Sequence, residues 1–136
     1  MTESMQDMGK RLIDAGETIL RRDARSALDE QDYNMVVRRV QEAVELTLKG
    51  ALKMLGADYP RVHDPAPVFS QQVRQKLSGV SSDTLAPIED VSLWLSQARA
   101  PSFYFERGYS EEDAHKAYDD GTFAIEEIKK IVKLIV

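Results

Sequence analysis

Apolar residues recur at intervals of three and four along nearly the whole chain, and alternating apolar and polar positions are missing. This spacing is typical of amphipathic helices and argues against strands. It predicts five helices, at about residues 2 or 4 to 30, 33–55, 66–78, 83–100 and 110–136. The third is short and the others are long. We therefore expect an all-α fold, an antiparallel up-and-down bundle of four long helices plus one short helix.

Capping residues mark the predicted helix boundaries. Side-chain oxygens that accept the free N–H groups of a first turn come just before three of the helices, from Asp32, from Ser82 or Asp83, and from Ser110 with Asp113. Gly56 and Gly79 are suited to the left-handed position after a helix, and we expect Pro101 to end the fourth helix.

The predicted helix at 33–55 has a clear core face and a polar margin beside it. Seven positions share the apolar arc: Tyr33, Val37, Val40, Val44, Leu48, Ala51 and Leu55. Arg38, Glu45 and Lys49 share the neighbouring arc, with Gln41 between them. Glu45 and Lys49 have the favourable order for a helical ion pair. The margin is either a solvated face with salt bridges or the wall of a binding groove.

The opposite side of the same helix is apolar as well, with Met35, Ala43, Leu46, Gly50 and Met54. A glycine in a helix interior costs about 1 kcal/mol relative to alanine, so a close approach of another backbone is expected there. One explanation is a twofold dimer through this face. The other is that the helix is central and buried on both sides within one chain. Phe123 and Leu134 also lie off the core face of the last helix and could join an interface.

Length and composition limit the classes of protein that need consideration. The 136 residues fit one domain spanning 1–136, large enough to bury a core without crosslinks. The chain has no cysteine, no apolar run long enough to span a membrane and no basic-then-apolar start, so we expect a cytoplasmic protein. The net charge of −5 disfavours non-specific nucleic-acid binding, including DNA, although a local basic patch is compatible with it.

Candidate chemistry is sparse because the chain has only two histidines. Glu112 and His115 have the spacing of one half of a di-metal carboxylate site, but the second half is missing. We therefore expect no metal and no cofactor. No nucleophile elbow or phosphate-binding glycine loop is present either. His63 lies in a loop bracketed by Pro60 and Pro65. Its ring either hydrogen-bonds a helix end or is held there to contact a base or a phosphate.

Several segments together resemble one known family, the HEPN (higher eukaryotes and prokaryotes nucleotide-binding) domain. The resemblance covers about residues 20–136 and rests on Gln41-x-Ala43-x-Glu45-x-x-x-Lys49-Gly50, then Gly56 and His63-Asp64, then Ala98-Arg99-x-Pro101 and Ser110-x-Glu112-x-Ala114. Gly50 replaces an alanine of the family pattern. The resemblance implies a helical bundle, commonly a dimer, with a polar groove near the interface.

Many members of that family are encoded beside a minimal nucleotidyltransferase and act as the toxin of a toxin–antitoxin pair. Catalytic members are metal-independent ribonucleases with an Arg-x(4–6)-His motif. This sequence departs from the motif, because Arg99 has no histidine soon after it and seven residues separate Arg107 from His115. Any ribonuclease activity would therefore need His63 to meet Arg99 through the fold.

The sequence is compatible with three functions. We favour a nucleotide-binding or accessory protein in a HEPN–nucleotidyltransferase system, with no assigned catalytic residue. The alternatives are a ribonuclease toxin and a non-catalytic dimerising adaptor that binds a nucleotidyltransferase. The ligand, a nucleotide or RNA, is expected at a groove lined by Arg38, Glu45, Lys49, His63, Arg99 and Tyr104.

Overall fold

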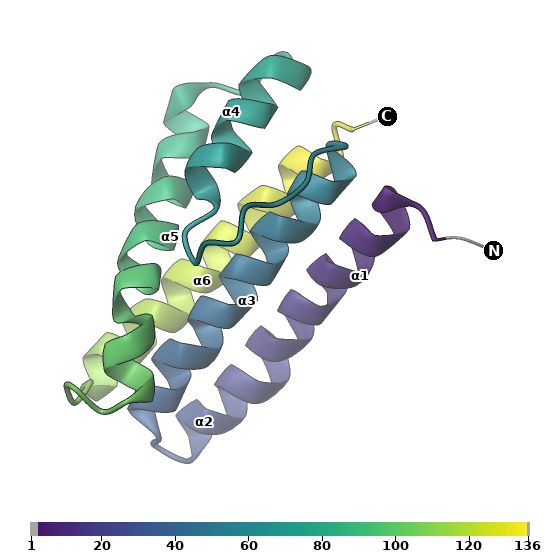
Figure 1. Cartoon of the computed structure of the whole chain (residues 1–136). Helices are drawn as coiled ribbons and strands as arrows, with labels where there is room; N and C mark the ends of the chain where they lie inside the picture. Colours follow the sequence, from purple (N-terminus) through teal and green to yellow (C-terminus); the bar gives the residue numbers. More distant parts are fainter. Residues whose placement is uncertain (1–2, 136) are drawn as a thin grey trace.

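All regular structure in residues 3–135, the part of the chain that the computed structural model describes, is helical. The elements are α1 (Met5–Thr18), η1 (Ile19–Ala24), α2 (Arg25–Asp29), α3 (Tyr33–Met54), α4 (Ala66–Lys76), α5 (Ser82–Phe103) and α6 (Glu111–Val132). Successive long helices alternate in direction and α4 is the short extra helix (Figure 1). The predicted all-α bundle is confirmed.

The first long helical segment is continuous from α1 through η1 to α2, as predicted. Six residues in its middle form the π-helix η1. This segment begins at Ser4, whose hydroxyl oxygen accepts a hydrogen bond from the Asp7 N–H. It ends at Gln31, which takes a left-handed φ of 62° while Asp32 N–H donates to Ala27 C=O. This is the hydrogen-bond pattern that closes many helices, normally with glycine in the left-handed position.

Helix α3 is the centre of the bundle, with α1 on one side and α5 and α6 on the others (Figure 1). Its side chains Val36, Val40, Leu48 and Leu52 are fully buried. Capping by Asp32 is confirmed, and so is the end at Gly56, where φ is 80° and Ala57 N–H reaches back to Leu52 C=O.

The small residues of α3 face α1 of the same chain, which corrects part of the predicted dimer interface. A Cβ on Gly50 would lie 2.6 Å from the Gly9 C=O and 2.9 Å from Ile13 Cγ1. Ala43 is fully buried beside Gly16. Burial against α1 therefore accounts for the spacing of Ala43 and Gly50. The larger members of that set, Met35, Leu46 and Met54, are half-buried.

Helix α5 differs from the prediction at both ends. Its cap is Ser81, whose hydroxyl accepts the Thr84 N–H, rather than Ser82 or Asp83. It also continues through Pro101 to Phe103. The carbonyl that Pro101 leaves without a helical partner belongs to Gln97, an exposed residue, so water can satisfy it. Phe105 then takes the left-handed position with φ 53°, and Glu106 N–H donates to Pro101 C=O.

The connection from α5 to α6 is tied to α3 by Asn34. The Asn34 amide donates to the carbonyls of Ser102 and Arg107, and its oxygen accepts the Tyr109 N–H. Helix α6 then opens with the predicted capping box between Ser110 and Asp113.

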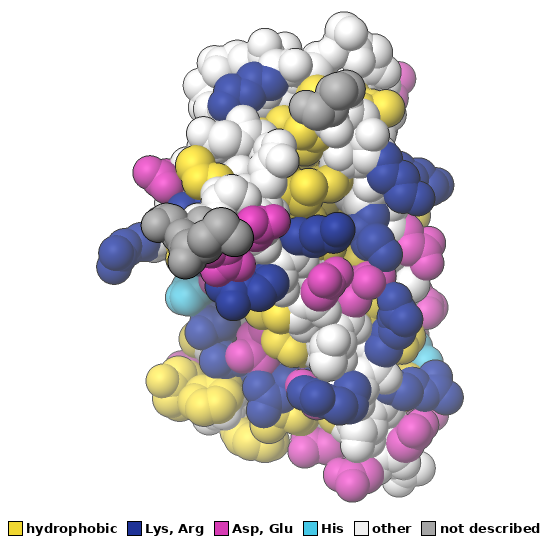
Figure 2. Space-filling model, turned by 90° about the vertical axis from the view of Figure 1, so that its right-hand side faces the viewer, with side chains coloured by type: hydrophobic (Ala, Val, Ile, Leu, Met, Phe, Trp, Pro, Cys, Tyr) yellow, Lys and Arg dark blue, Asp and Glu magenta, His cyan; other side chains and the backbone are white. Residues whose placement is uncertain are grey.

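The surface on the α1 side of the molecule carries intermingled basic and acidic side chains with smaller apolar areas between them (Figure 2). No helix in the described residues is long and apolar enough to cross a membrane. Within 3–135 no three His, Asp or Glu side chains gather as a metal site would require.

Candidate functional site

A hollow of about 330 Å³ lies between the first half of α3, the loop at 57–65 and the last turns of α5. Its lining comes from all three segments: Arg38, His63, Ser96, Arg99, Ala100, Phe103 and Tyr104. Four of these, Arg38, His63, Arg99 and Tyr104, belong to the predicted ligand-binding set. Residues as far apart as 38 and 104 in sequence therefore meet at one place.

The loop that carries His63 returns along α3 before α4 begins (Figure 1). The reversal follows from the left-handed Gly56 at the end of α3. The far end of the loop is fixed because Ser92 Oγ donates to Asp64 Oδ1 at 2.6 Å. Pro60 and Pro65 restrict the backbone on either side. These constraints hold the imidazole of His63 beside α3.

Glu45 is the centre of a hydrogen-bonded network beside the hollow. Its Oε1 accepts from Gln41 Nε2 at 2.8 Å and lies 3.0 Å from His63 Nδ1, and its Oε2 accepts from Lys49 Nζ at 2.9 Å. Burial alone would raise the pKa of the Glu45 carboxyl. The hydrogen bonds it accepts, led by that from Lys49, outweigh burial, so the pKa lies below its ordinary value.

Arg99 joins this network from α5. Its guanidinium donates to Gln41 Oε1 at 2.8 Å and lies 3.9 Å from Glu45 Oε1. Gln41 therefore bridges the arginine and the carboxylate, one through each end of its amide. Sequence reasoning left Gln41 out of the site. Its place on the polar margin, one turn before Glu45, was the available signal.

Arg38 is the least satisfied cation of the site. Its Nε is a buried side-chain nitrogen without a hydrogen-bond partner in the described residues, and the nearest carboxylate oxygen, of Glu42, is 3.9 Å away. Its guanidinium carbon lies 4.4 Å from the centre of the Phe103 ring. Burial, together with repulsion from Arg99, lowers the pKa of Arg38. An anion placed in the hollow would relieve both effects.

Aromatic side chains form the outer rim of the hollow. Phe103 and Tyr104 meet edge to face with centroids 4.9 Å apart. Tyr104 and Phe105 are about 70% exposed, unusual for large rings in a bundle this small. Exposed ring faces next to arginines are suited to stacking a planar base.

Lys49 and Glu45 are the two predicted site residues that do not line the hollow. The Lys49 ammonium pairs with Glu45 and lies 5.1 Å from the Tyr59 ring, on the loop. Glu45 takes part in the site indirectly, because its carboxylate oxygens already face Lys49, Gln41 and His63. Glu45 contacts two residues that line the hollow, His63 and Arg99, and Lys49 is connected to them through Glu45.

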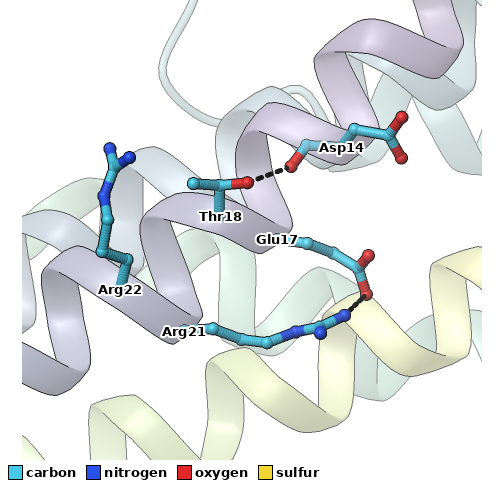
Figure 3. Close-up of a pocket in the computed structure, with 5 residues that line it drawn as sticks. All are labelled: Asp14, Glu17, Thr18, Arg21 and Arg22. Atoms are coloured by element: carbon cyan, nitrogen blue, oxygen red, sulfur yellow. Dashed lines mark hydrogen bonds and ion pairs between the residues drawn. The ribbon is translucent and has the colours of Figure 1, made fainter.

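A second hollow, on α1 and η1, does not have the same character. Asp14, Glu17, Thr18, Arg21 and Arg22 line it, and Figure 3 shows Arg21 turned toward Glu17. Glu17 is paired with Arg21 at 3.0 Å and with Lys129 at 2.5 Å. Burial opposes ionisation of Glu17, but these partners outweigh it and lower its pKa. Glu17, Arg21 and Arg22 are paired within the chain, which leaves less charge to attract a ligand.

The ribonuclease motif is also missing at the site itself. Spacings of four to six residues after Arg99 fall on Tyr104, Phe105 and Glu106 rather than on histidine. The imidazole in the hollow comes instead from His63, which meets Arg99 through their shared neighbour Glu45. His115 lies on α6 and is exposed, next to Glu111.

The fold and the site together describe a small helical-bundle protein with a cationic, aromatic-rimmed hollow beside its central helix. The family model for the HEPN domain matches residues 11–133, and the chain belongs to that family. The crystal structure of an archaeal HEPN homologue is similar in fold, with a TM-score of 0.67 and 20% sequence identity. The match covers 96% of this chain and 99% of the homologue. No curated protein sequence matches the chain.

Proposed function

We propose that this HEPN protein binds a nucleotide, or the end of an RNA strand, through a phosphate held by Arg38 and Arg99. The observation that carries the proposal is the pair of arginines at one hollow. Among the described residues the buried Nε of Arg38 has no hydrogen-bond partner, and burial, followed by repulsion from Arg99, lowers the pKa of Arg38. A phosphate bound by the two guanidinium groups would supply the counter-charge that both arginines lack on the side of the hollow.

The rest of the lining suits the other parts of a nucleotide. His63 offers a ring nitrogen at the edge of the hollow, and Ser96 offers a hydroxyl. Phe103 and Tyr104 offer ring faces for the base. Glu45 keeps the cations in place and does not contact the ligand, because both of its oxygens already have partners.

Calorimetric titration with AMP, ADP, ATP and a short single-stranded RNA tests this function. Replacing Arg38 by methionine should weaken binding about 10- to 100-fold, the range of one or two charge-assisted hydrogen bonds. Arg39→Met is the matched control. Arg39 is the adjacent residue on α3, pairs with Glu42 at 2.7 Å and does not line the hollow, so its loss should change affinity less than twofold. Absence of binding by the wild-type protein at millimolar ligand would exclude the proposal.

A ribonuclease activity is the second candidate, and a specific contact favours it. The 3.0 Å contact between His63 Nδ1 and Glu45 fixes the ring, and Arg99 is near enough to share that carboxylate. A carboxylate-oriented imidazole can move a proton while an arginine stabilises phosphorane charge. Cleavage of RNA without metal should then be lost in His63→Ala and Arg99→Ala but kept in His115→Ala. If RNA stays intact with the wild-type protein, this candidate is excluded.

A wider setting for the protein is a further part of the proposal. We propose a minimal nucleotidyltransferase as the partner, with this chain as the accessory or toxin half of the pair. Co-expression with a neighbouring nucleotidyltransferase gene product, followed by affinity purification and growth assays, tests it. A partner that neither co-purifies nor changes growth would refute it. A partner that binds equally well after Arg38→Met would instead favour the adaptor function.

A further inference from the structure

The hollow between α3, the loop and α5, which we call the arginine hollow, is lined by two arginines and by no carboxylate. Arg38 comes from α3 and Arg99 from α5. The other lining residues add no acid: His63, Ser96, Ala100, Phe103 and Tyr104. The wall therefore carries two positive charges, and the groups behind it decide how much of that excess a ligand experiences.

Arg38 has no carboxylate of its own. The nearest, Glu42, is 3.9 Å from Arg38 Nε and is already paired with Arg39 at 2.7 Å. Arg38 donates no side-chain hydrogen bond within the described residues, and the Phe103 ring covers one face of its guanidinium at 4.4 Å. Its side chain is only 14% exposed, so water screens this charge less than it would at the surface.

Arg99 is in a similar position on the opposite wall. The nearest carboxylate, Glu45, is 3.9 Å away and is paired with Lys49 at 2.9 Å. Arg99 Nη1 donates to the neutral amide of Gln41, and its other two guanidinium nitrogens make no hydrogen bond within the described residues. Several N–H donors of the two arginines are therefore free for a ligand.

The remaining charges near the hollow do not cancel this excess. Asp64 follows His63 on the loop, but its carboxylate accepts from Ser92, which lies seven residues before Arg99 and hence about 10.5 Å farther along α5. Arg61, on the same loop, makes no ion pair within the described residues. Glu106, beyond the end of α5, is exposed, and solvent screens its charge.

The charge of a phosphate depends on how many of its oxygens are esterified. A phosphomonoester carries about −1.5 to −2 at pH 7, because its second pKa is about 6, and it has three strong acceptor oxygens. A phosphodiester inside a nucleic-acid strand carries a single negative charge and has two free oxygens. Since Coulomb attraction is proportional to the charge of the ligand, each arginine attracts the monoester nearly twice as strongly.

We propose that the arginine hollow selects a terminal phosphate, the dianionic phosphomonoester of a mononucleotide or of a strand end, over the phosphodiester inside a strand. The inference rests on the proposed nucleotide binding and adds the ester and charge state of the group that is bound. Two arginines without carboxylates of their own, with donors to spare, match two negative charges on three oxygens.

Calorimetric titration at pH 7.5 with AMP and with its phosphate methyl ester tests the selection, because the ester has lost one negative charge and one free oxygen. AMP should bind about 10-fold tighter or more. Arg38→Met should reduce this ratio to about threefold, since one of the two charges remains. Arg39→Met is the matched control and should keep the full ratio, because Arg39 does not line the hollow.

The same pair of ligands gives a pH profile with a definite sign. As the pH falls from 7.5 to 5, AMP takes up its second proton near pH 6, so its affinity should fall toward that of the methyl ester. Protonation of His63 over this range would strengthen binding of both ligands, so it cannot make the two affinities converge. A ratio that stays constant with pH would contradict the proposed selection.

Short single-stranded RNAs of one sequence, ending in a 5′-phosphate, in a 3′-phosphate or in hydroxyls only, extend the test to strands. At least one phosphorylated strand should bind about 10-fold tighter than the unphosphorylated one. Equal affinities for all three strands, or for AMP and its methyl ester, would overturn the inference while leaving nucleotide binding in place. Absence of binding by every ligand would refute the proposed function, and this inference with it.

Discussion

Replacing Glu45 by glutamine removes one negative charge from the centre of the network and leaves its shape almost unchanged. The side chains of Glu45 and Lys49 are only 14% and 13% exposed, and their charged atoms are 2.9 Å apart. The change therefore leaves a largely buried ammonium without its anion. Arg99, 3.9 Å from the same carboxylate, loses its counter-charge as well.

The cost can be estimated from the burial of these groups. Removing one partner of a buried ion pair costs about 3–5 kcal/mol when nothing replaces it. The glutamine keeps a carbonyl oxygen that can still accept from Lys49, which reduces the loss. His63, whose side chain is 55% exposed, adds little because solvent screens it. We expect a loss of about 2–3 kcal/mol in the free energy of unfolding, or roughly 8–12 °C in Tm.

Urea denaturation and thermal unfolding at pH 7 measure this loss, with Glu127→Gln as the control. Glu127 pairs with the exposed Lys130 on the surface of α6, so its replacement should cost below about 1 kcal/mol. The pKa of Glu45 is lowered in the folded protein, so its ionisation stabilises the fold above the ordinary value of 4.5. That contribution disappears as the pH falls through the folded-state pKa. The difference between wild type and variant should shrink correspondingly. A loss below about 0.5 kcal/mol at pH 7 would refute the reasoning.

Three further predictions concern the backbone. Gly50→Ala should destabilise the fold by about 2 kcal/mol in urea denaturation despite its better helix propensity, because the added Cβ meets the Gly9 carbonyl, whereas Gly108→Ala, with open space around it, should be nearly neutral. Asn34→Ala should cost about 2–4 kcal/mol by leaving three backbone groups of the α5–α6 connection without partners, and hydrogen exchange should show that connection opening first. Phe105→Gly should raise Tm by a few degrees, because glycine adopts its left-handed φ of 53° without strain.

Much of the fold could be predicted from the sequence because local signals agree with the tertiary structure. The caps at Asp32 and Ser110 satisfy N–H groups that any helix start leaves free. The end of α5 was predicted wrongly for a physical reason. Proline removes one hydrogen bond, and the acceptor that loses it, Gln97 C=O, belongs to an exposed residue, so the helix continues. That exposure depends on the fold and not on the local sequence.

The site was predictable to the extent that its residues share a helix face. Glu45 and Lys49 are one turn apart on α3, so their pairing follows from spacing alone. The meeting of His63 with Glu45, and of Arg99 with Gln41, depends on the return of the loop along α3 and on the packing of α5. The two explanations for the opposite face of α3 could not be separated by periodicity, because buried and dimeric faces have the same apolar pattern. The position of Gly9 opposite Gly50 accounts for the glycine of that face within one chain.

A protein with a net charge of −5 can still hold a phosphate if its cations are gathered and fixed in place, and Glu45 pairs with Lys49 and lies 3.9 Å from Arg99. The carboxylate offsets the mutual repulsion of Lys49 and Arg99, but it also competes with a ligand for Arg99. Glu45→Gln should therefore have opposite effects on two properties, lowering stability and strengthening phosphate binding several-fold. Calorimetric titration of AMP at a temperature where the variant is fully folded measures the second effect. Weaker binding, with helical content unchanged, would mean that the carboxylate itself contacts the ligand and that the arginines alone do not define the site.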